Sequence, residues 1–313
     1  MSELQELVQN LEETSAAVEN MARALESAPD DDVLKINAAS ICRRRDDLVR
    51  RLDYALHTKQ QELIRYRIMR DWTDAYPAKA VAASMLAFQE LVTSVFDAIR
   101  SQPKQRYRPS LENIALSTFD FAGAAAGSVV ISLAVPNDRL LVGETELDET
   151  LGLVERALSA RESGDLKALA EKIGIASIAK AYAWAETSVA HEINTEIRWG
   201  KSYSAMQELT ITRDEARVVK EVIENKSDTI ADETTIEGVL LGFDGATSYF
   251  HLETIGDRVD IRGNLADDLS RAWMTDQLYR AQLLRTAQVR YATGEEKVQW
   301  TLLALTPLTP PSA

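Results

Sequence analysis

The sequence predicts an α+β protein with several domains: an N-terminal antiparallel helical hairpin or bundle, a mixed α/β middle domain, and a small C-terminal β-barrel of SH3-like or OB-like layout. Three observations support this. Apolar residues recur every three and four positions near the N-terminus, alternation replaces that period after SQPKQRYRPS, and short alternating runs divided by turn dipeptides follow towards the C-terminus. The expected boundaries are a helical region at 1–100, a linker at 101–110, a mixed domain at 111–226, a barrel at 232–306 and a loose tail at 307–313.

A heptad seam, which is a stripe of apolar or small side chains along one face, predicts the first helix. Ala28-Pro29-Asp30 ends the seam, and the following aspartates suit the N-terminus of a second helix, expected from about Asp32 to Trp72. Two helices with matching seams and a short break predict an antiparallel hairpin. The seam of the first helix is our candidate surface for self-association or partner binding: Leu4, Leu7, Leu11, Val18, Met21 and Leu25.

Charge favours the same pairing of the two helices. Residues 1–32 hold nine acidic side chains against one basic, and residues 43–70 hold nine basic against four acidic. A phosphate-tracking helix is the alternative interpretation of RRRDDLVRR (43–51) and RYRIMR (65–70). The acidic first helix already supplies the opposite charge, so we favour a charged face that helps the hairpin to form.

A third helix is expected from about Ala78 to Arg100, and the proline-containing linker follows it. Within the linker, KQRYR places three cations around one tyrosine with no obvious acidic partner nearby. Cations with an aromatic ring in an exposed strip are typical of proteins that bind single-stranded nucleic acid. An ordinary solvated linker is the alternative. The candidate nucleic-acid contacts are Lys104, Arg106, Tyr107 and Arg108.

The middle domain opens near FAGAAAGSVVISLAVP (121–136). Its glycines miss the spacing of a P-loop and the lysine is absent, so tight backbone packing or turn geometry is the favoured explanation. We expect strands at Ile114–Phe121 and Ser128–Val135, helices at Glu146–Ala160, Asp165–Ile173 and Ile175–Ala190, a hairpin of Asn194–Trp199 with Met206–Thr212, and a helix from an N-cap at Thr212 to about Glu224.

The C-terminal barrel is predicted from three short runs, IEGVLLGFD, TSYFHLET and DRVDIRGNL, which are divided by Asp244-Gly245 and Gly256-Asp257. A polar and helix-compatible stretch at Asp267–Asp276 precedes two longer strands, expected at Leu278–Tyr291 and Lys297–Leu305. Small barrels of this layout bind many different ligands, so the layout by itself indicates no function.

Few residues carry an obvious chemistry. The chain has three histidines, and HEINTE (191–196) lacks the second histidine of a zinc-protease motif. The single cysteine, Cys42, excludes an internal disulfide and a thiolate metal cluster. We therefore predict no catalytic residue, no cofactor and no metal site. A catalytic site that assembles in space from the α/β region stays open as an alternative, because the members of such sites need not be neighbours in sequence.

The net charge of −14 disfavours non-specific binding to nucleic acid or anionic lipid. The apolar-rich run at 121–135 is too short to span a membrane, and the acidic N-terminus does not resemble a signal peptide. These features, with the scarcity of cysteine, predict a cytoplasmic protein.

The function predicted is that of a non-enzymatic interaction or scaffold protein, an accessory subunit of a bacterial-type intracellular complex, which self-associates or binds a protein partner through its N-terminal helices. The first alternative is a nucleic-acid-associated protein that uses the linker strip and the barrel, by analogy with accessory factors of antiviral systems and mobile elements. The second alternative is an enzyme with its site in the α/β domain.

Overall fold

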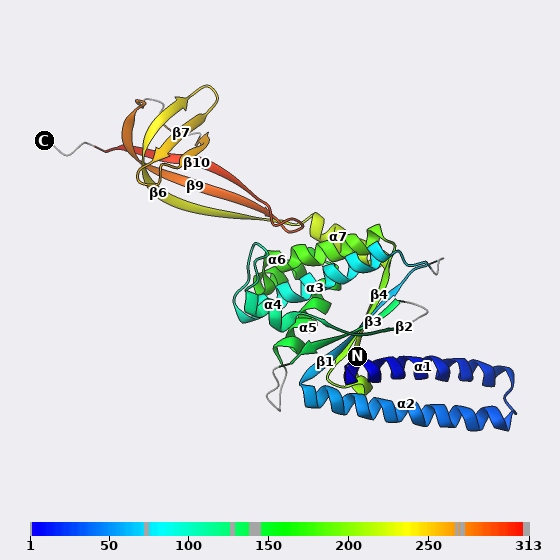
Figure 1. Ribbon diagram of the computed structural model, residues 1–313. Helices are drawn as coiled ribbons and strands as arrows, with labels where there is room; N and C mark the ends of the chain where they lie inside the picture. Colours follow the sequence, from blue (N-terminus) through cyan, green and yellow to red (C-terminus); the bar gives the residue numbers. More distant parts are fainter. Residues whose placement is uncertain are drawn as a thin grey trace. The chain divides into compact units, whose positions relative to one another are not determined.

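The computed structural model describes residues 2–71, 75–125, 129–137, 145–266, 269 and 273–308. Over these residues the chain is an α+β protein, as predicted, and it divides into two compact units, Met1–Asn225 and Lys226–Ala313 (Figure 1). The first unit holds the described helices and one sheet, and the second unit holds the other sheet.

The helices of the first unit include the expected N-terminal pair. A short 3-10 turn, η1 (Tyr203–Ala205), lies between β4 (Asn194–Gly200) and β5 (Gln207–Ile211). The helices are α1 (Glu3–Ser27), α2 (Asp32–Lys59), α3 (Ala78–Arg100), α4 (Leu111–Ser117), α5 (Glu146–Leu158), α6 (Ser163–Ala190) and α7 (Arg213–Glu224).

The first sheet has five strands in the order β2-β3-β1-β4-β5, and every neighbouring pair is antiparallel. The strand that follows the hairpin in sequence is therefore the central strand, and its two partners come from much later in the chain. Its strands are β1 (Gln61–Met69), β2 (Asp120–Ala125), β3 (Val129–Pro136), β4 (Asn194–Gly200) and β5 (Gln207–Ile211).

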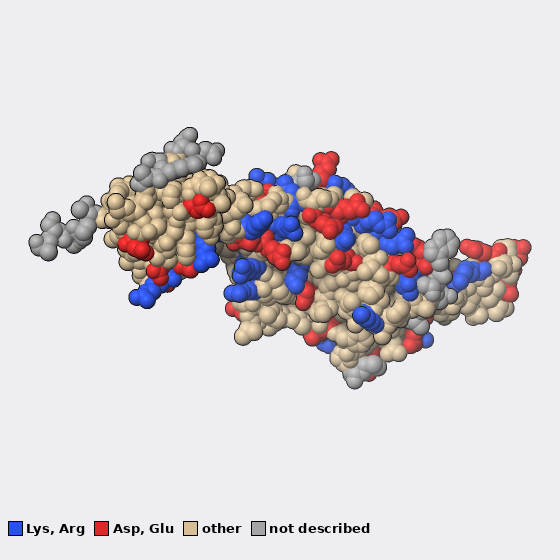
Figure 2. Space-filling view, turned by 90° about the horizontal axis from the view of Figure 1, so that it is seen from above, with Lys and Arg blue, Asp and Glu red and all other residues tan. Residues whose placement is uncertain are grey.

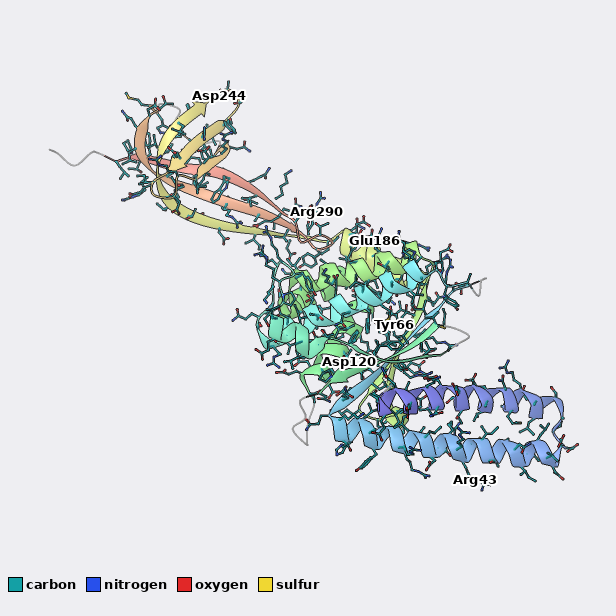
Figure 3. All side chains as sticks on the ribbon, in the orientation of Figure 1. Arg43, Tyr66, Asp120, Glu186, Asp244 and Arg290 are labelled. Carbon is teal, nitrogen blue, oxygen red and sulfur yellow. The ribbon has the colours of Figure 1, made fainter. Side chains whose placement is uncertain are left out.

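The two faces of β1 differ in chemistry because successive side chains point to opposite sides of a sheet. Ile64, Tyr66 and Ile68 are fully or almost fully buried on the side of α3 and α6. The hydroxyl of Tyr66 bonds Ser84 of α3 at 2.8 Å and accepts the indole N–H of Trp184 of α6 at 2.9 Å (Figure 3). Burial raises the pKa of Tyr66, so this hydroxyl stays protonated in the core.

Helices α1 and α2 pack side by side as the predicted hairpin (Figure 1). Ser2 forms a capping box with Gln5 at the start of α1, and Asp31 accepts the amides of Val33 and Leu34 at the start of α2. The base of the hairpin rests on the sheet through one apolar cluster: Leu4, Leu7, Val8, Leu11, Leu48, Leu52, Ala55, Leu56, Leu63, Ala122 and Ala134.

The second helix is shorter than we predicted. It ends at Lys59, where Gln60 takes the left-handed conformation with φ of 51°, and residues 61–69 form β1 instead of continuing the helix to Trp72. The basic motif RYRIMR therefore lies largely on the central strand. Its alternation of isoleucine, tyrosine and isoleucine with arginine fits a strand with one apolar and one charged face.

The predicted strand at Ile114–Phe121 is also wrong over most of its length. Ser110 accepts the amide of Asn113 and caps α4, so residues 111–117 are helical, and β2 begins at Asp120. The second predicted strand of this pair is confirmed as β3, within the described residues 129–136. The predicted elements from Glu146 to Glu224 are confirmed with small shifts at their ends, including the Thr212 capping box of α7.

Among the described residues, α3 alone is long and apolar enough to cross a membrane by length and composition. In this fold it is a core helix: Phe88, Leu91, Val92 and Val95 have no exposed surface, and the ring of Phe88 contacts that of Tyr66 on β1. The pattern that fits a membrane is thus explained by burial within the first unit.

The second unit is a ring of hydrogen-bonded strands in the order β10-β8-β7-β6-β9, with β10 and β8 parallel where they meet. Strand β6 is longer than expected, because it begins before the apolar run at 236–244. The described residues 273–276 of the stretch that we considered helix-compatible contain no helix, and residues 267, 268 and 270–272 lie outside the described part. The strands are β6 (Ser227–Asp244), β7 (Tyr249–Thr254), β8 (Asp260–Leu265), β9 (Gln277–Arg290) and β10 (Glu296–Pro307).

Candidate functional site

The seam of the first helix divides into two halves. Leu4, Leu7 and Leu11 are buried in the apolar cluster at the base of the hairpin, whereas Val18, Met21 and Leu25 are only half-buried. The hairpin extends beyond the sheet in Figure 1, and no described helix or strand covers the end of it near the turn. Two large apolar residues near the turn, Val33 and Ile36, are 67% and 68% exposed.

Ion pairs contribute little to the contact between the two helices. Among the described residues, the ion pair recorded between them is that of Lys59 with Glu3, at 4.0 Å and at the base. Arg45 and Arg50 pair with Asp46 and Asp47 of their own helix. Apolar burial at the base therefore holds the hairpin together, and the opposite charges stay on its surface.

The predicted linker 101–110 is held firmly against the first unit. The ammonium group of Lys104 bonds Asp97, which is 3% exposed, and it also donates to the carbonyl of Arg108 at 3.0 Å. Burial disfavours the charged form of Asp97, but hydrogen bonds from Lys104, Asn113 and the amide of Ser110 outweigh it and lower the pKa of this carboxyl. An acidic partner for Lys104 thus exists, although the sequence did not show it.

Tyr107 is likewise engaged within the fold. The ammonium nitrogen of Lys180 lies 4.1 Å from the centre of the Tyr107 ring, and the same group pairs with Glu90 at 2.7 Å. Arg106 and Arg108 are exposed. The four residues that we proposed as nucleic-acid contacts are therefore not equivalent, because two of them are occupied by internal contacts and two face the solvent.

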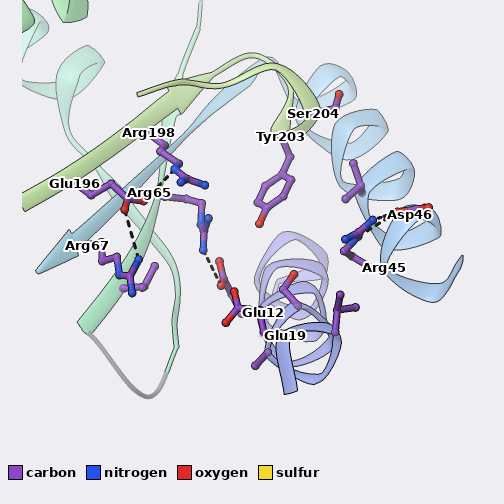
Figure 4. Close-up of a pocket in the computed structure, with 15 residues that line it drawn as sticks. Glu12, Glu19, Arg45, Asp46, Arg65, Arg67, Glu196, Arg198, Tyr203 and Ser204 are labelled. Carbon is purple, nitrogen blue, oxygen red and sulfur yellow. Dashed lines mark hydrogen bonds and ion pairs between the residues drawn. The ribbon is translucent and has the colours of Figure 1, made fainter. Parts of the chain in front are cut away.

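A cavity of about 680 Å³ lies where the hairpin meets the open face of the sheet (Figure 4). Helices α1 and α2 form its walls, strands β1, β3 and β4 form its floor, and η1 contributes Tyr203 and Ser204. Its charged lining residues are Glu12, Glu19, Arg45, Asp46, Arg65, Arg67, Glu196 and Arg198.

Carboxylates within the cavity pair with its arginines. Arg65 donates to Glu12 of α1 at 2.8 Å, and both side chains are at most 16% exposed. Glu196 lies between Arg67 and Arg198, at 3.4 Å and 2.9 Å. Arg198 has a second carboxylate partner, Glu208 of β5, at 3.0 Å. The cavity is therefore rich in charge and close to neutral.

Tyr203 is positioned by a carboxylate of α2. Asp53 accepts hydrogen bonds from the hydroxyl of Ser202 at 2.8 Å, the amide of Tyr203 at 2.6 Å and the hydroxyl of Ser204 at 3.0 Å. Burial raises the pKa of Tyr203, the nearby Glu12 adds to this, and Arg65 opposes it. The ring lies between the arginines of the sheet and Arg45 of α2 in Figure 4.

The apolar stretch at 121–136 has a packing role where the structure describes it. A Cβ added to Gly123 would meet Val8 of α1 at 3.0 Å, so the glycine allows the hairpin to approach the sheet closely. Residues 126–128 of the GAAAGS segment lie outside the described part. The described residues hold no group of three or more histidine, cysteine, aspartate or glutamate side chains arranged to hold a metal ion.

The residues of the cavity were not found from the sequence. They come from α1, α2, β1, β3, β4 and η1, and no local motif links positions 12, 65 and 198. One signal was present: the alternation of arginine with apolar residues in RYRIM, which places two arginines on one face of a strand. Comparisons with protein-family models, curated proteins and solved structures gave no match for this chain.

Proposed function

We propose that this protein is a non-enzymatic interaction or scaffold protein that self-associates through the outer half of the α1–α2 hairpin. The observation that carries the proposal is the incomplete burial of that half. Its seam residues are half-buried and Val33 and Ile36 are largely exposed, whereas Leu4, Leu7 and Leu11 near the base are buried. A second pair of helices would cover the seam and form a four-helix bundle with α1 and α2.

Charge supports a second copy of the same chain as the occupant. Helix α1 carries six acidic side chains and one basic, and α2 carries seven basic and four acidic. Among the described residues one ion pair, Lys59 with Glu3, joins the two helices. An arrangement with two-fold symmetry would place the acidic helix of each copy against the basic helix of the other. A partner with a similar pair of helices is the alternative occupant.

The test is the mass of the full chain in solution, measured by light scattering after size-exclusion chromatography. We expect a dimer, and we expect Val33→Ser with Ile36→Ser to shift it towards monomer. Leu111→Ser is the matched control, since Leu111 is 86% exposed on α4 and lies outside the hairpin. A wild-type chain that is monomeric at every concentration tested would contradict the proposal.

A nucleic-acid-associated role is the second candidate, and the exposure of Arg106 and Arg108 is the observation in its favour. The second unit lends it less support, because residues 226–313 carry 13 acidic side chains against 8 basic. The face of this unit that Figure 2 shows carries few charged side chains. Binding of labelled oligonucleotides to wild type and to Arg106→Ala with Arg108→Ala, over a series of salt concentrations, tests this role.

We also propose a small barrel of SH3-like or OB-like layout for the second unit, and a cytoplasmic location for the protein. The closure of five strands into a ring around Phe250, Leu252 and Leu302 supports the first point. The single cysteine and the burial of α3 support the second. No residue of the described part favours the alternative of an enzyme over these proposals.

A further inference from the structure

Two arginines face each other across neighbouring strands in the cavity at the base of the hairpin. Arg65 of β1 and Arg198 of β4 are direct partners in the antiparallel register, and Arg67 lies two residues along the same face. Like charges placed directly opposite on a sheet destabilise it. In this fold the carboxylates of Glu12, Glu196 and Glu208 offset the repulsion between the two guanidiniums.

The cavity above these arginines is large enough for a small molecule. Its volume of about 680 Å³ lies within the range of roughly 300–1,000 Å³ that is typical of ligand sites. Polar side chains surround it on several sides: Tyr203 and Ser204 from η1, Ser15 from α1 and Arg45 from α2. The bonds from residues 202–204 to Asp53 fix the segment that carries Tyr203.

One guanidinium in the cavity has unused hydrogen-bonding capacity. Arg65 uses a terminal nitrogen to bond Glu12, but its Nε is buried without a hydrogen-bond partner. A buried donor without a partner is costly, and an oxyanion can accept from Nε and a terminal nitrogen of one guanidinium at the same time. Glu12 accepts from the terminal nitrogen of Arg65 but leaves its Nε without an acceptor.

We propose that this cavity binds a small molecule through a phosphate group, which Arg65 and Arg198 hold and to which the hydroxyl of Tyr203 donates. Among the described residues Arg65 pairs with Glu12 alone, whereas Arg198 pairs with Glu196 and Glu208, so a doubly charged phosphate exchanges for carboxylates at both guanidiniums. Its oxygens match their planar donor geometry. The carboxylate of Glu12 occupies Arg65 in the absence of the ligand, so the phosphate competes with Glu12 of the first helix.

Calorimetric titration of the full chain with inorganic phosphate and with ribose 5-phosphate tests this, with ribose as the uncharged comparison. We expect both phosphates to bind and ribose not to bind. Arg198→Met should weaken binding about tenfold or more, as the loss of charge-assisted hydrogen bonds does. Arg217→Met on α7 is the matched control, because this arginine is exposed and pairs only with Asp214 among the described residues, and it should bind as wild type does.

Glu12→Gln gives a result in the opposite direction. It removes the competing carboxylate but keeps the shape of the side chain, so it should tighten phosphate binding. A structural role for Glu12 alone would not predict that gain. The proposal is overturned if neither phosphate binds at concentrations up to about 10 mM, if Arg198→Met binds as tightly as wild type while folded by circular dichroism, or if Arg217→Met loses binding equally.

Discussion

Gly174 is required by its backbone conformation and by its neighbour. Its φ of 79° lies in the region that favours glycine, and a Cβ added there would come within 2.4 Å of the backbone nitrogen and oxygen of Lys104. The adjacent amide of Ala176 donates to the carbonyl of Lys104 at 3.0 Å. The kink in α6 is thus the point at which the 101–110 segment attaches to the helical layer.

Gly174→Ala should therefore destabilise the protein strongly, by about 3 kcal/mol or more, since it combines an unfavourable φ with a backbone clash. Gly152→Ala is the matched control, because Gly152 lies inside α5 with nothing within 4 Å of the added Cβ. The control should stabilise by about 0.5–1 kcal/mol. Urea unfolding of both variants measures the difference, and equal effects would disprove the role assigned to Gly174.

Asp97 should make the free energy of unfolding of the first unit depend on pH in the acid range. Its pKa is lowered in the folded state, so its contribution is complete above the ordinary aspartate pKa of about 3.9 and is lost as the pH falls through the folded pKa. Asp97→Asn should cost about 2–3 kcal/mol at pH 7. This deficit should shrink as the pH falls through the folded pKa of Asp97, because the wild-type carboxyl then becomes protonated as well.

Urea unfolding at neutral and acid pH measures this change in the deficit. Asp214→Asn is the control, because the Asp214 side chain is 72% exposed and should change the free energy of unfolding by less than about 0.5 kcal/mol at either pH. A deficit for Asp97→Asn that is independent of pH would show that the loss comes from packing and not from charge.

At the scale of elements, the sequence predicted the helices of the hairpin and most of the strands, because their periods and caps are local signals. It failed at β1, since no glycine or proline separates Lys59 from Gln61 and the helix ends at a left-handed glutamine. It failed at α4 because seven residues are too few for a helical period to be distinguished from alternation. The cavity was missed because its residues meet only when the sheet forms.

The exposed basic side chains of α2 provide a test of how the hairpin associates. Arg43 lies on the side of α2 away from α1 (Figure 3), and Arg44 is also exposed. Arg43→Glu with Arg44→Glu should weaken self-association at low salt, because the acidic α1 of a second copy would then meet like charge.

Sedimentation of this double variant at low and high salt measures the effect, which should diminish at high salt as the charges are screened. Arg217→Glu on α7 is the control, since it changes charge in the same direction, by half as much, outside the hairpin. Unchanged association of the double variant at low salt would show that charge does not direct the pairing.

At the scale of the whole molecule, two units with separate cores should unfold in two steps. Leu52→Ala should lower the free energy of unfolding of the first unit by about 2–5 kcal/mol. Phe250→Ala should lower that of the second unit by about 3–5 kcal/mol. Helical circular dichroism follows the first unit, because the described helices lie there. Calorimetry that shows one transition, shifted by either substitution, would contradict independent cores.

The central position of β1 also has a consequence for the growing chain on the ribosome. Met69 of β1 pairs with Asn194 of β4, so one edge of the strand stays unpaired until the later residues have been synthesised. At typical rates of translation this delay is on the order of ten seconds. Trp184 of α6, which bonds the hydroxyl of Tyr66, is also made late in that interval. Tyr66 is therefore incompletely covered on the nascent strand, and a chaperone that shields it would be expected to increase the yield of folded protein.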